Sequence, residues 1–379
     1  MKLSKKRVRE AGYTLPGKTG EYNAITDVAG VEVGYKTITF GEPSDYKGAG
    51  SPFARTGVTM ILPQGKKRSA LFVGRHNLNG NGELTGTHWM DDSGYLHGPI
   101  GITNTNSVGI VRDTLAKWMI DNNYYYPYIH EGKPIEGVGY FYPVVGETWD
   151  GLMNDTNGFH VTASDVYEAI DDAKTGPIAE GNVGGGNGMQ CHEFKGGTGT
   201  SSRVLTDAEG GYTLGVLVQA NHGTRACFEM FGVPIGRLLK GGEARLETFS
   251  PKPGTGSIIV VIATDAPVSP LQLQKICKRI PIAIGRLGAG FENDSGDIFL
   301  AFSTANNTAY QDNKATLISD DALDPIYKAT AEAVEEAILN AMFAAESMTG
   351  KANNHFYALP QDDVYNILKE YRSDILKTF

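Results

Sequence analysis

The segment that most constrains the fold is a run of five consecutive aliphatic residues, Ile258 to Ile262. All five are β-branched, so the length and composition of the run predict a strand buried inside a sheet. Ser257 comes directly before this run, behind the glycines Gly254 and Gly256. Taken alone, these residues have the pattern of an ordinary turn followed by a strand whose first residue is a serine.

Short apolar runs separated by turn residues occupy most of the chain up to about residue 320. They predict strands over 57–62, 70–73, 108–111, 212–219, 257–263 and 297–302. Capping residues and helical periodicity predict helices over 113–122, 164–174 and 270–280, and longer helices over 324–348 and 362–376. Because glycine never collects into a linker, we expect a single domain over residues 1–379, with stacked sheets covered by helices.

Charge and apolar content exclude several classes of protein. A net charge of −9, with 41% hydrophobic and 20% charged residues, is typical of a compact enzyme and argues against binding to a nucleic-acid backbone. The chain has no 18-residue apolar run and no apolar core of a signal peptide, so we predict no membrane segment and a cytoplasmic protein. The basic residues Lys2, Lys5, Lys6, Arg7 and Arg9 are expected to lie in a solvated start of the chain.

Cysteine and histidine residues give no sign of a metal or a cofactor. The three cysteines, Cys191, Cys227 and Cys277, have no paired spacing, which is typical of ordinary thiols in a reducing compartment. The eight histidines are spread without the spacing of metal ligands. We therefore predict neither a cofactor nor a metal site.

Two motifs match known binding sequences but lack their structural context. Residues 12–19, GYTLPGKT, have the letters of a phosphate-binding loop, yet no apolar strand precedes them and no helical segment follows. Residues 44–47 and 174–176 imitate the Ser-x-x-Lys and Lys-Thr-Gly pair of penicillin-recognising enzymes, but Ser44 stands among glycines and prolines instead of at a helix start. Neither motif is interpreted as a site.

Two segments are unusually rich in glycine: residues 77–89, NLNGNGELTGTHW, and residues 180–203, EGNVGGGNGMQCHEFKGGTGTSSR. Glycine has no Cβ atom and tolerates positive φ angles. These segments therefore predict places where the backbone comes close to a substrate or to another strand.

Together with the second of these segments, the strings GPIGITNTNSVG, PVVGETWDG, LVQANHG and SGDIFLAFSTAN give the whole chain a clear resemblance to a known family. The chain resembles the DmpA-type aminopeptidases, also called L-aminopeptidase/D-esterases or β-aminopeptidases. The resemblance implies a four-layer αββα sandwich of the DmpA/ornithine-acetyltransferase-like type. It also implies a precursor that cuts its own chain before a serine, which corresponds to cleavage between Gly256 and Ser257 into chains 1–256 and 257–379.

The family's mechanism gives Ser257 a chemical reason to open its strand. A serine hydroxyl is a weak nucleophile unless a base takes up its proton. An α-amine titrates near 7.7–8.0, much closer to neutrality than a lysine, so the amine freed by cleavage can act as that base. The glycines before Ser257 would let the hydroxyl reach the Gly256 carbonyl for an N-to-O acyl shift.

The resemblance assigns roles to five further residues. Asn221 matches an asparagine whose amide faces the oxyanion, and Ser295 and Asp297 match a serine and an acid that orient and polarise the nucleophile. The acid is Asp here, as in some relatives, whereas others have Glu. Glu147 matches a carboxylate that meets the cationic amine of the substrate. Trp149 stands where one member has a tyrosine, and we interpret it as a wall of the pocket, because an indole N–H can donate but cannot accept a hydrogen bond.

We therefore expect a serine aminopeptidase that acts on short peptides, amino-acid amides or esters, with family members assembling as oligomers, commonly tetramers of processed chains. An acyl transferase like ornithine acetyltransferase, which uses threonine, and an inactive binding relative of the same fold are the alternatives. The sequence leaves open whether L-α, D-α or β-amino residues are preferred at the substrate's amino terminus.

Overall fold

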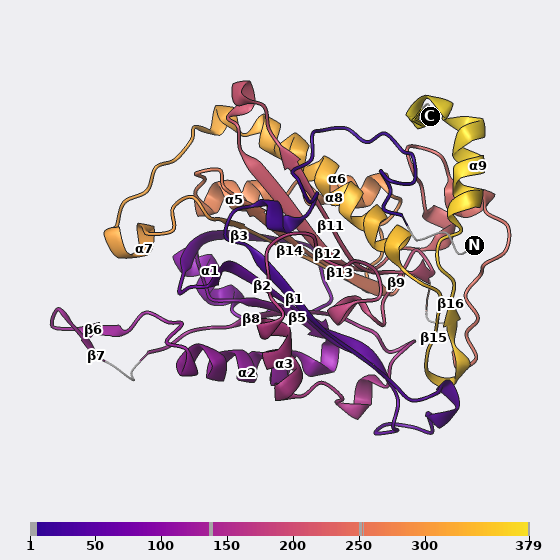
Figure 1. Cartoon of the computed structure of the whole chain (residues 1–379), viewed down its shortest axis with the longest axis horizontal. Helices are drawn as coiled ribbons and strands as arrows, with labels where there is room; N and C mark the ends of the chain where they lie inside the picture. The colour runs from indigo at the N-terminus through magenta and orange to yellow at the C-terminus, as the bar shows by residue number, and fades with distance from the viewer. Residues whose placement is uncertain (1–5, 136–138, 250–251, 253, 378–379) are drawn as a thin grey trace.

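Two β-sheets lie face to face at the centre of the molecule, and helices cover the outer face of each (Figure 1). This computed structural model describes residues 6–135, 139–249, 252 and 254–377. The order of the layers is helix, sheet, sheet, helix, which confirms the predicted αββα sandwich. Among the described residues, no helix is both long and apolar enough to cross a membrane.

The larger sheet has six strands in the order β11-β12-β13-β14-β3-β4. Their bounds are β11 Gly197–Val204, β12 Thr213–Asn221, β13 Gly256–Thr264, β14 Ser295–Ser303, β3 Ala70–Gly80 and β4 Tyr95–His97. Strands β13 and β14 are parallel, and the other neighbours are antiparallel. The aliphatic run predicted to be a buried strand is thus a central strand, with neighbours on both sides.

The smaller sheet has four strands in the order β1-β2-β5-β8. Their bounds are β1 Glu32–Phe40, β2 Ala54–Lys66, β5 Ile100–Asn104 and β8 Val144–Thr148. Short two-stranded sheets pair β6 Tyr128–His130 with β7 Lys133–Ile135, β9 Gln190–Cys191 with β10 Phe194–Lys195, and β15 Met348–Thr349 with β16 His355–Phe356. The β6–β7 hairpin projects from the body of the molecule (Figure 1).

Five helices form the two outer layers. Helices α5 Pro270–Cys277, α6 Ile280–Arg286 and α8 Asp324–Ala344 cover the six-stranded sheet, and α2 Val108–Asp121 and α3 Ala163–Asp171 cover the four-stranded sheet. The remaining α-helices are α1 Thr87–Ser93, α4 Ile235–Leu238, α7 Ala309–Asp312 and α9 Gln361–Tyr371. The long helices predicted near the carboxyl terminus are therefore present as α8 and α9, although both end earlier than predicted.

Strand β13 contributes side chains to two separate cores. Ile258, Val260 and Ile262 pack in the core shared with α5, α6 and α8, whereas Ile259 and Val261 pack in the core between the two sheets. This alternation follows from the two-residue period of a strand. It places Ser257 on the same face of β13 as Ile259 and Val261, the face that packs against the four-stranded sheet.

The predicted strand over 108–111 is wrong, because these residues begin α2. The Asn104 side chain accepts a hydrogen bond from the Ser107 backbone N–H and starts a short 3-10 turn that leads into the helix. Val108 and Val111 are three residues apart and both buried. Taken alone, residues 108–111, VGIV, have the composition of a strand. The three-residue spacing of the two valines, however, fits one face of a helix.

The glycine-rich segment 180–203 lies where elements come into close contact, as predicted. A Cβ atom at Gly199 in β11 would stand 2.0 Å from the Ala337 carbonyl oxygen of α8. A Cβ atom at Gly185 would stand 2.7 Å from the Ile102 carbonyl oxygen of β5. Glycine at these positions therefore lets a helix and a strand lie directly on this segment.

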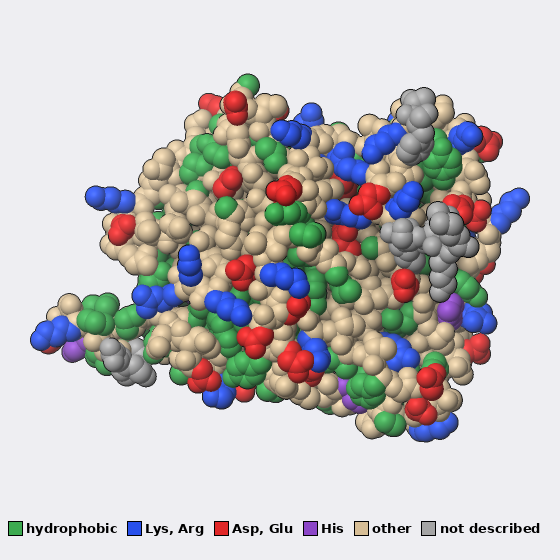
Figure 2. Space-filling view, viewed as in Figure 1, with side chains coloured by type: hydrophobic (Ala, Val, Ile, Leu, Met, Phe, Trp, Pro, Cys, Tyr) green, Lys and Arg blue, Asp and Glu red, His purple; other side chains and the backbone are tan. Residues whose placement is uncertain are grey.

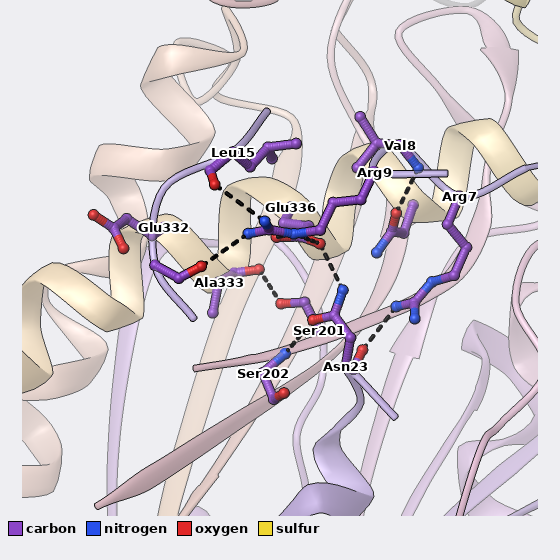
Figure 3. Close-up of polar contacts among 12 residues, drawn as sticks. Arg7, Val8, Arg9, Leu15, Asn23, Ser201, Ser202, Glu332, Ala333 and Glu336 are labelled. Atoms are coloured by element: carbon purple, nitrogen blue, oxygen red, sulfur yellow. Dashed lines mark hydrogen bonds and ion pairs between the residues drawn. The ribbon is translucent and has the colours of Figure 1, made fainter. Parts of the chain in front are cut away.

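A buried network of charges joins the amino-terminal segment to α8 (Figure 3). The Arg9 Nε atom donates to both carboxylate oxygens of Glu336, at 2.8 and 2.9 Å. Arg203 of β11 donates to the same carboxylate at 2.8 Å. Burial alone would raise the pKa of Glu336, but hydrogen bonds from Arg9 and the charges of Arg203 and Arg9 lower it below its usual value.

The prediction of a solvated start is therefore wrong for Arg7 and Arg9, whereas Lys6 is exposed and Lys2 and Lys5 lie outside the described residues. Arg7 forms an ion pair with Glu180 at 2.7 Å, and the side chains of Arg7 and Arg9 are mostly buried. Elsewhere on the face drawn in Figure 2, Lys and Arg side chains alternate with Asp and Glu side chains, so no basic stripe is present on that face.

Candidate active site

Ser257 is the second residue of β13 and lies beneath the surface, with 3% of its area exposed. It is in register with Asn221 of β12 on one side and with Gly296 of β14 on the other. Among the described residues, no hydrogen-bond partner of the Ser257 hydroxyl is found. Ser257 thus stands near the end of a central strand, with no described residue hydrogen-bonded to its hydroxyl.

The chain before Ser257 turns sharply, and the glycines are required there. Gly254 has a φ angle of +85°, which L residues rarely adopt. At Gly256, a Cβ atom would lie 2.3 Å from the Asn221 carbonyl oxygen. The predicted glycine corner is thus present, and it presses the Gly256–Ser257 peptide against the end of β12.

Asn221 is held by two backbone groups. Its side-chain nitrogen donates to the Trp149 carbonyl oxygen at 2.9 Å, and its side-chain oxygen accepts from the Gln190 N–H at 2.9 Å. These bonds fix which end of the amide carries the nitrogen. An asparagine amide has two N–H donors, so one of them has no hydrogen-bond acceptor among the described residues.

Ser295 and Asp297 lie on β14, one residue before and one after Gly296, the register partner of Ser257. The Ser295 hydroxyl donates to the Asp297 carboxylate at 2.7 Å, and both residues are buried. Burial raises the pKa of Asp297 to about 6, and the bond from Ser295 opposes that shift. Side chains alternate between the two faces of a strand, so the Ser295 and Asp297 side chains project from the face opposite to that of Gly296. They therefore lie beside the backbone of residues 256–258 and not beside the Ser257 side chain.

Glu147, the fourth residue of β8, is buried and accepts two hydrogen bonds. The donors are the Glu83 backbone N–H, at 3.0 Å, and the Thr105 hydroxyl. Burial raises the pKa of Glu147, while these two bonds oppose the shift. A Cβ atom at Gly82 would stand 3.1 Å from the carboxylate and 3.5 Å from the Gly296 Cα. The Glu147 carboxylate thus lies close to Gly82, which in turn lies close to Gly296, the register partner of Ser257.

Trp149 is half-buried, with its ring centroid 6.5 Å from that of Phe249. The role of Trp149 as a pocket wall stays a prediction. Its backbone carbonyl, however, is the group that contacts Asn221. This contact is not visible in the sequence, because a backbone group is the same for every residue type.

A cavity of about 160 Å³ lies directly before the scissile position predicted from the sequence, lined in part by Gln190, Gly223, Gly254 and Thr255. A larger hollow of about 660 Å³ lies over β3, α1 and α5 and includes none of the predicted site residues. The small cavity is the more relevant one, because it adjoins the residues that precede Ser257.

Several site residues were missed by the sequence analysis. Gln190 is 31 residues from Asn221, and Thr105 is 42 residues from Glu147. The structure also brings together Cys191, His192 and His222, whose ligand atoms lie within 4.8 Å of one another. The Cys-His pair and the histidine after Asn221 were visible in the sequence, but only the pairing of their segments makes them neighbours.

Chemically, the site combines a free hydroxyl, an oriented amide donor and a buried acid of raised pKa around one peptide bond. Such an arrangement supports acyl transfer to a serine oxygen, with the amide stabilising the oxyanion.

Comparison with known proteins identifies close relatives. The profile of peptidase family S58 matches residues 23–356. A beta-peptidyl aminopeptidase, BapA, of Sphingosinicella microcystinivorans is 45% identical, over 97% of this chain and 92% of the relative. Two solved structures are also similar. The L-aminopeptidase D-Ala-esterase/amidase of Ochrobactrum anthropi, a variant of the Ntn hydrolase fold, is 42% identical with a TM-score of 0.87, covering 98% of this chain and 99% of that one. A Burkholderia beta-aminopeptidase is 41% identical with a TM-score of 0.83, covering 96% and 99%.

Proposed function

The chain belongs to peptidase family S58 and is a serine aminopeptidase of the N-terminal-nucleophile kind, and from this premise we propose that Ser257 is its nucleophile. The observation that carries the proposal is the position of Ser257. It opens a rigid central strand, behind a glycine corner and in register with Asn221. A precursor chain cut between Gly256 and Ser257 would leave that hydroxyl and a free α-amine on the same residue.

Self-cleavage proceeds by attack of the Ser257 oxygen on the Gly256 carbonyl carbon. The peptide C–N bond breaks, the hydroxyl proton moves to the Ser257 nitrogen, and an ester joins the two chains. Water then hydrolyses the ester, which leaves a carboxylate at Gly256 and restores the hydroxyl. Chains 1–256 and 257–379 result.

Turnover of a substrate repeats this chemistry between molecules. The freed α-amine takes the hydroxyl proton as Ser257 attacks the carbonyl of the substrate, and the free N–H of Asn221 stabilises the oxyanion. The amine or alcohol leaves with that proton, and water hydrolyses the acyl-enzyme. Ser295 and Asp297 lie beside the backbone at residue 257, so their role is to hold the α-amine in place.

The substrates we propose are short peptides, amino-acid amides and esters with a free amino terminus. Glu147 binds the substrate's cationic amine, and Trp149 forms a wall of the pocket. Hydrolysis is favoured over acyl transfer of the ornithine-acetyltransferase type because the matched family and relatives are peptidases.

Intact-mass spectrometry of the purified protein tests the proposal. The expected result is two species corresponding to residues 1–256 and 257–379, whose masses sum to that of the chain plus one water, together with release of amine from amino-acid p-nitroanilides. A single species of 40.8 kDa that still turned over these substrates would contradict the role of the freed amine.

Glu147→Gln should raise KM for substrates with a protonated amine by roughly 10- to 100-fold, the loss expected for a charge-assisted hydrogen bond. Glutamine keeps an acceptor for the Glu83 N–H, so the fold should remain. Self-cleavage should continue, because the precursor presents no free amine at this position. Steady-state kinetics and gel analysis of the same preparation measure both effects. An uncut chain with normal KM would assign Glu147 to the cutting machinery instead.

The pH profile of kcat/KM should have two acidic steps. Turnover needs a neutral α-amine, which titrates near 7.7–8.0, and an ionised Asp297, whose pKa burial raises to about 6. The slope of log kcat/KM against pH should therefore steepen from one to two at a pH below about 6, because the protonated α-amine beside Asp297 lowers the pKa of that carboxyl in the processed chain. Asp297→Asn should lower the rate and keep a slope of one throughout.

The effect of Asp297 on stability runs in the opposite direction. Its pKa is higher in the folded than in the unfolded chain, so its contribution to stability is fully present below the unfolded pKa and is lost as pH rises through about 6. Acid below pH 6 should thus slow the enzyme while protonation of this one group favours the folded state. A wild-type profile of kcat/KM without a second acidic step would contradict the proposed role of Asp297 in turnover.

We also propose a cytoplasmic homo-oligomer, a tetramer of processed chains. The projecting β6–β7 hairpin supports an oligomer, because it carries exposed Tyr128 and Ile129 (Figure 1, Figure 2). Sedimentation equilibrium of the processed protein measures the state, and the mass of a single pair of chains would contradict it. Cell fractionation tests the location.

A further inference from the structure

Three side chains of residue types that commonly bind metals lie close together next to Asn221: those of Cys191, His192 and His222. Cys191 ends β9, His192 follows it, and His222 follows the last residue of β12. The His192 backbone N–H donates to the His222 carbonyl at 2.7 Å, which holds the two segments together. All three side chains are fully or almost fully buried, and His222 Nδ1 lies 3.9 Å from Cys191 Sγ.

Both imidazoles have a buried nitrogen without a partner. His192 Nδ1 lies 3.2 Å from the Thr224 carbonyl oxygen, and a proton on that nitrogen leaves the lone pair on Nε2. Among the described residues, neither His192 Nε2 nor His222 Nε2 has a hydrogen-bond partner. A buried polar atom without a partner is costly. Metal-binding histidines commonly donate their second nitrogen to a backbone carbonyl, as His192 does here.

The spacing and ligand types of the group fit a metal ion. With bonds of about 2.3 Å to sulfur and 2.0–2.1 Å to nitrogen, two tetrahedral ligands of zinc stand about 3.5 Å apart. The ligand atoms of this group all lie within 4.8 Å, so small side-chain movements suffice. Neutral imidazole nitrogen and thiolate sulfur are ligand types that zinc prefers, and this group offers two imidazoles and one cysteine sulfur.

We propose that Cys191, His192 and His222 bind one zinc ion. Binding exchanges the thiol proton of Cys191 for the metal, so one proton is released and a thiolate-zinc bond forms. Three protein ligands leave a fourth position for water. The ion joins the segment after Gln190 to the segment after Asn221, the two residues that share a hydrogen bond at the oxyanion position. Its role is to hold Asn221 in place, and it takes no part in the reaction steps.

The test measures metal content of the full chain produced in cells supplied with Zn²⁺ or Co²⁺, because the site is buried and loads as the chain folds. We expect about one metal ion per chain after exhaustive dialysis. Cys191→Ser should reduce bound metal by at least about tenfold. The matched control is Cys277→Ser, which removes another buried thiol whose contact is the Gly74 carbonyl, and it should retain the metal.

A second measurement needs no variant and so does not depend on folding of Cys191→Ser. The cobalt-loaded wild-type protein should absorb in the near ultraviolet through charge transfer from thiolate to cobalt, and in the visible range with the intensity of a tetrahedral site. Absence of stoichiometric metal in the wild-type protein, equal metal in Cys191→Ser, or cobalt bound without the thiolate band would each overturn the proposal.

Discussion

Ser257→Ala should yield a single uncut chain with no measurable aminopeptidase activity, a fall in kcat on the order of 10⁶-fold by comparison with loss of the nucleophile in other serine hydrolases. The variant should fold, because the hydroxyl that it removes has no hydrogen-bond partner among the described residues. Alanine also suits the second position of a strand whose neighbours, Asn221 and Gly296, keep their register. Intact mass, circular dichroism and amide turnover on one preparation measure the three outcomes.

Ser257→Cys separates the two reactions of this one side chain. A thiol with a pKa near 8.5 attacks readily without a strong base, so self-cleavage should survive. Turnover of amides should fall, because the site is shaped for an oxygen nucleophile with shorter bonds. A Ser257→Ala chain that was still cut at Gly256, or that still hydrolysed amides, would remove Ser257 from the mechanism.

Local sequence was sufficient to predict β13 and the glycine corner before it. Five β-branched residues in succession have few alternatives to a buried strand, and a glycine that must adopt a positive φ angle is visible as a residue type. The assignment of Ser257 as nucleophile needed the resemblance over the whole chain, because a serine at a strand start is common. Thus the strand was predictable from physics, and its chemistry from the family.

Contacts that depend on the stacking of distant segments could not be predicted in this way. The Asn221 amide is oriented by the backbone of Gln190 and Trp149, and backbone groups are the same for every residue type. The opposite faces taken by Ser257 and the Ser295 and Asp297 pair follow from the register of β13 with β14, which no spacing within either strand specifies. Charged residues such as Arg9 were assigned to the solvent because a buried partner was not apparent.

The buried ion pairs of Glu336 would join the two chains of the processed enzyme. Arg9 and Arg203 belong to residues 1–256, whereas Glu336 on α8 belongs to residues 257–379. The side chains of Glu336 and Arg203 are 0% and 2% exposed. After cleavage, these ion pairs would hold two separate chains together, along with the Asn340 side chain that accepts from the Val8 N–H (Figure 3).

Glu336→Gln should therefore destabilise the protein by about 3 kcal/mol, the lower end of the cost of removing one partner from a buried ion pair. The lower end applies because Arg9 is partly exposed and Glu332 remains 3.7 Å from Arg203. Urea unfolding of the variant in the uncut Ser257→Ala background gives this free energy. In the processed protein, the same change should let the two chains separate at lower urea concentration.

Glu335→Gln is the matched control for this experiment. Glu335 is the next residue on α8, but its partner is Arg286, at 3.1 Å, so both ends of that ion pair lie within residues 257–379. Arg286 is half exposed, and a pair of this kind contributes roughly 0–1 kcal/mol. Glu335→Gln should thus leave the urea midpoint nearly unchanged and should not affect association of the two chains. Equal effects of the two variants would mean that the buried network does not join the chains, and that apolar packing of α8 against β11 and β12 is sufficient to hold them.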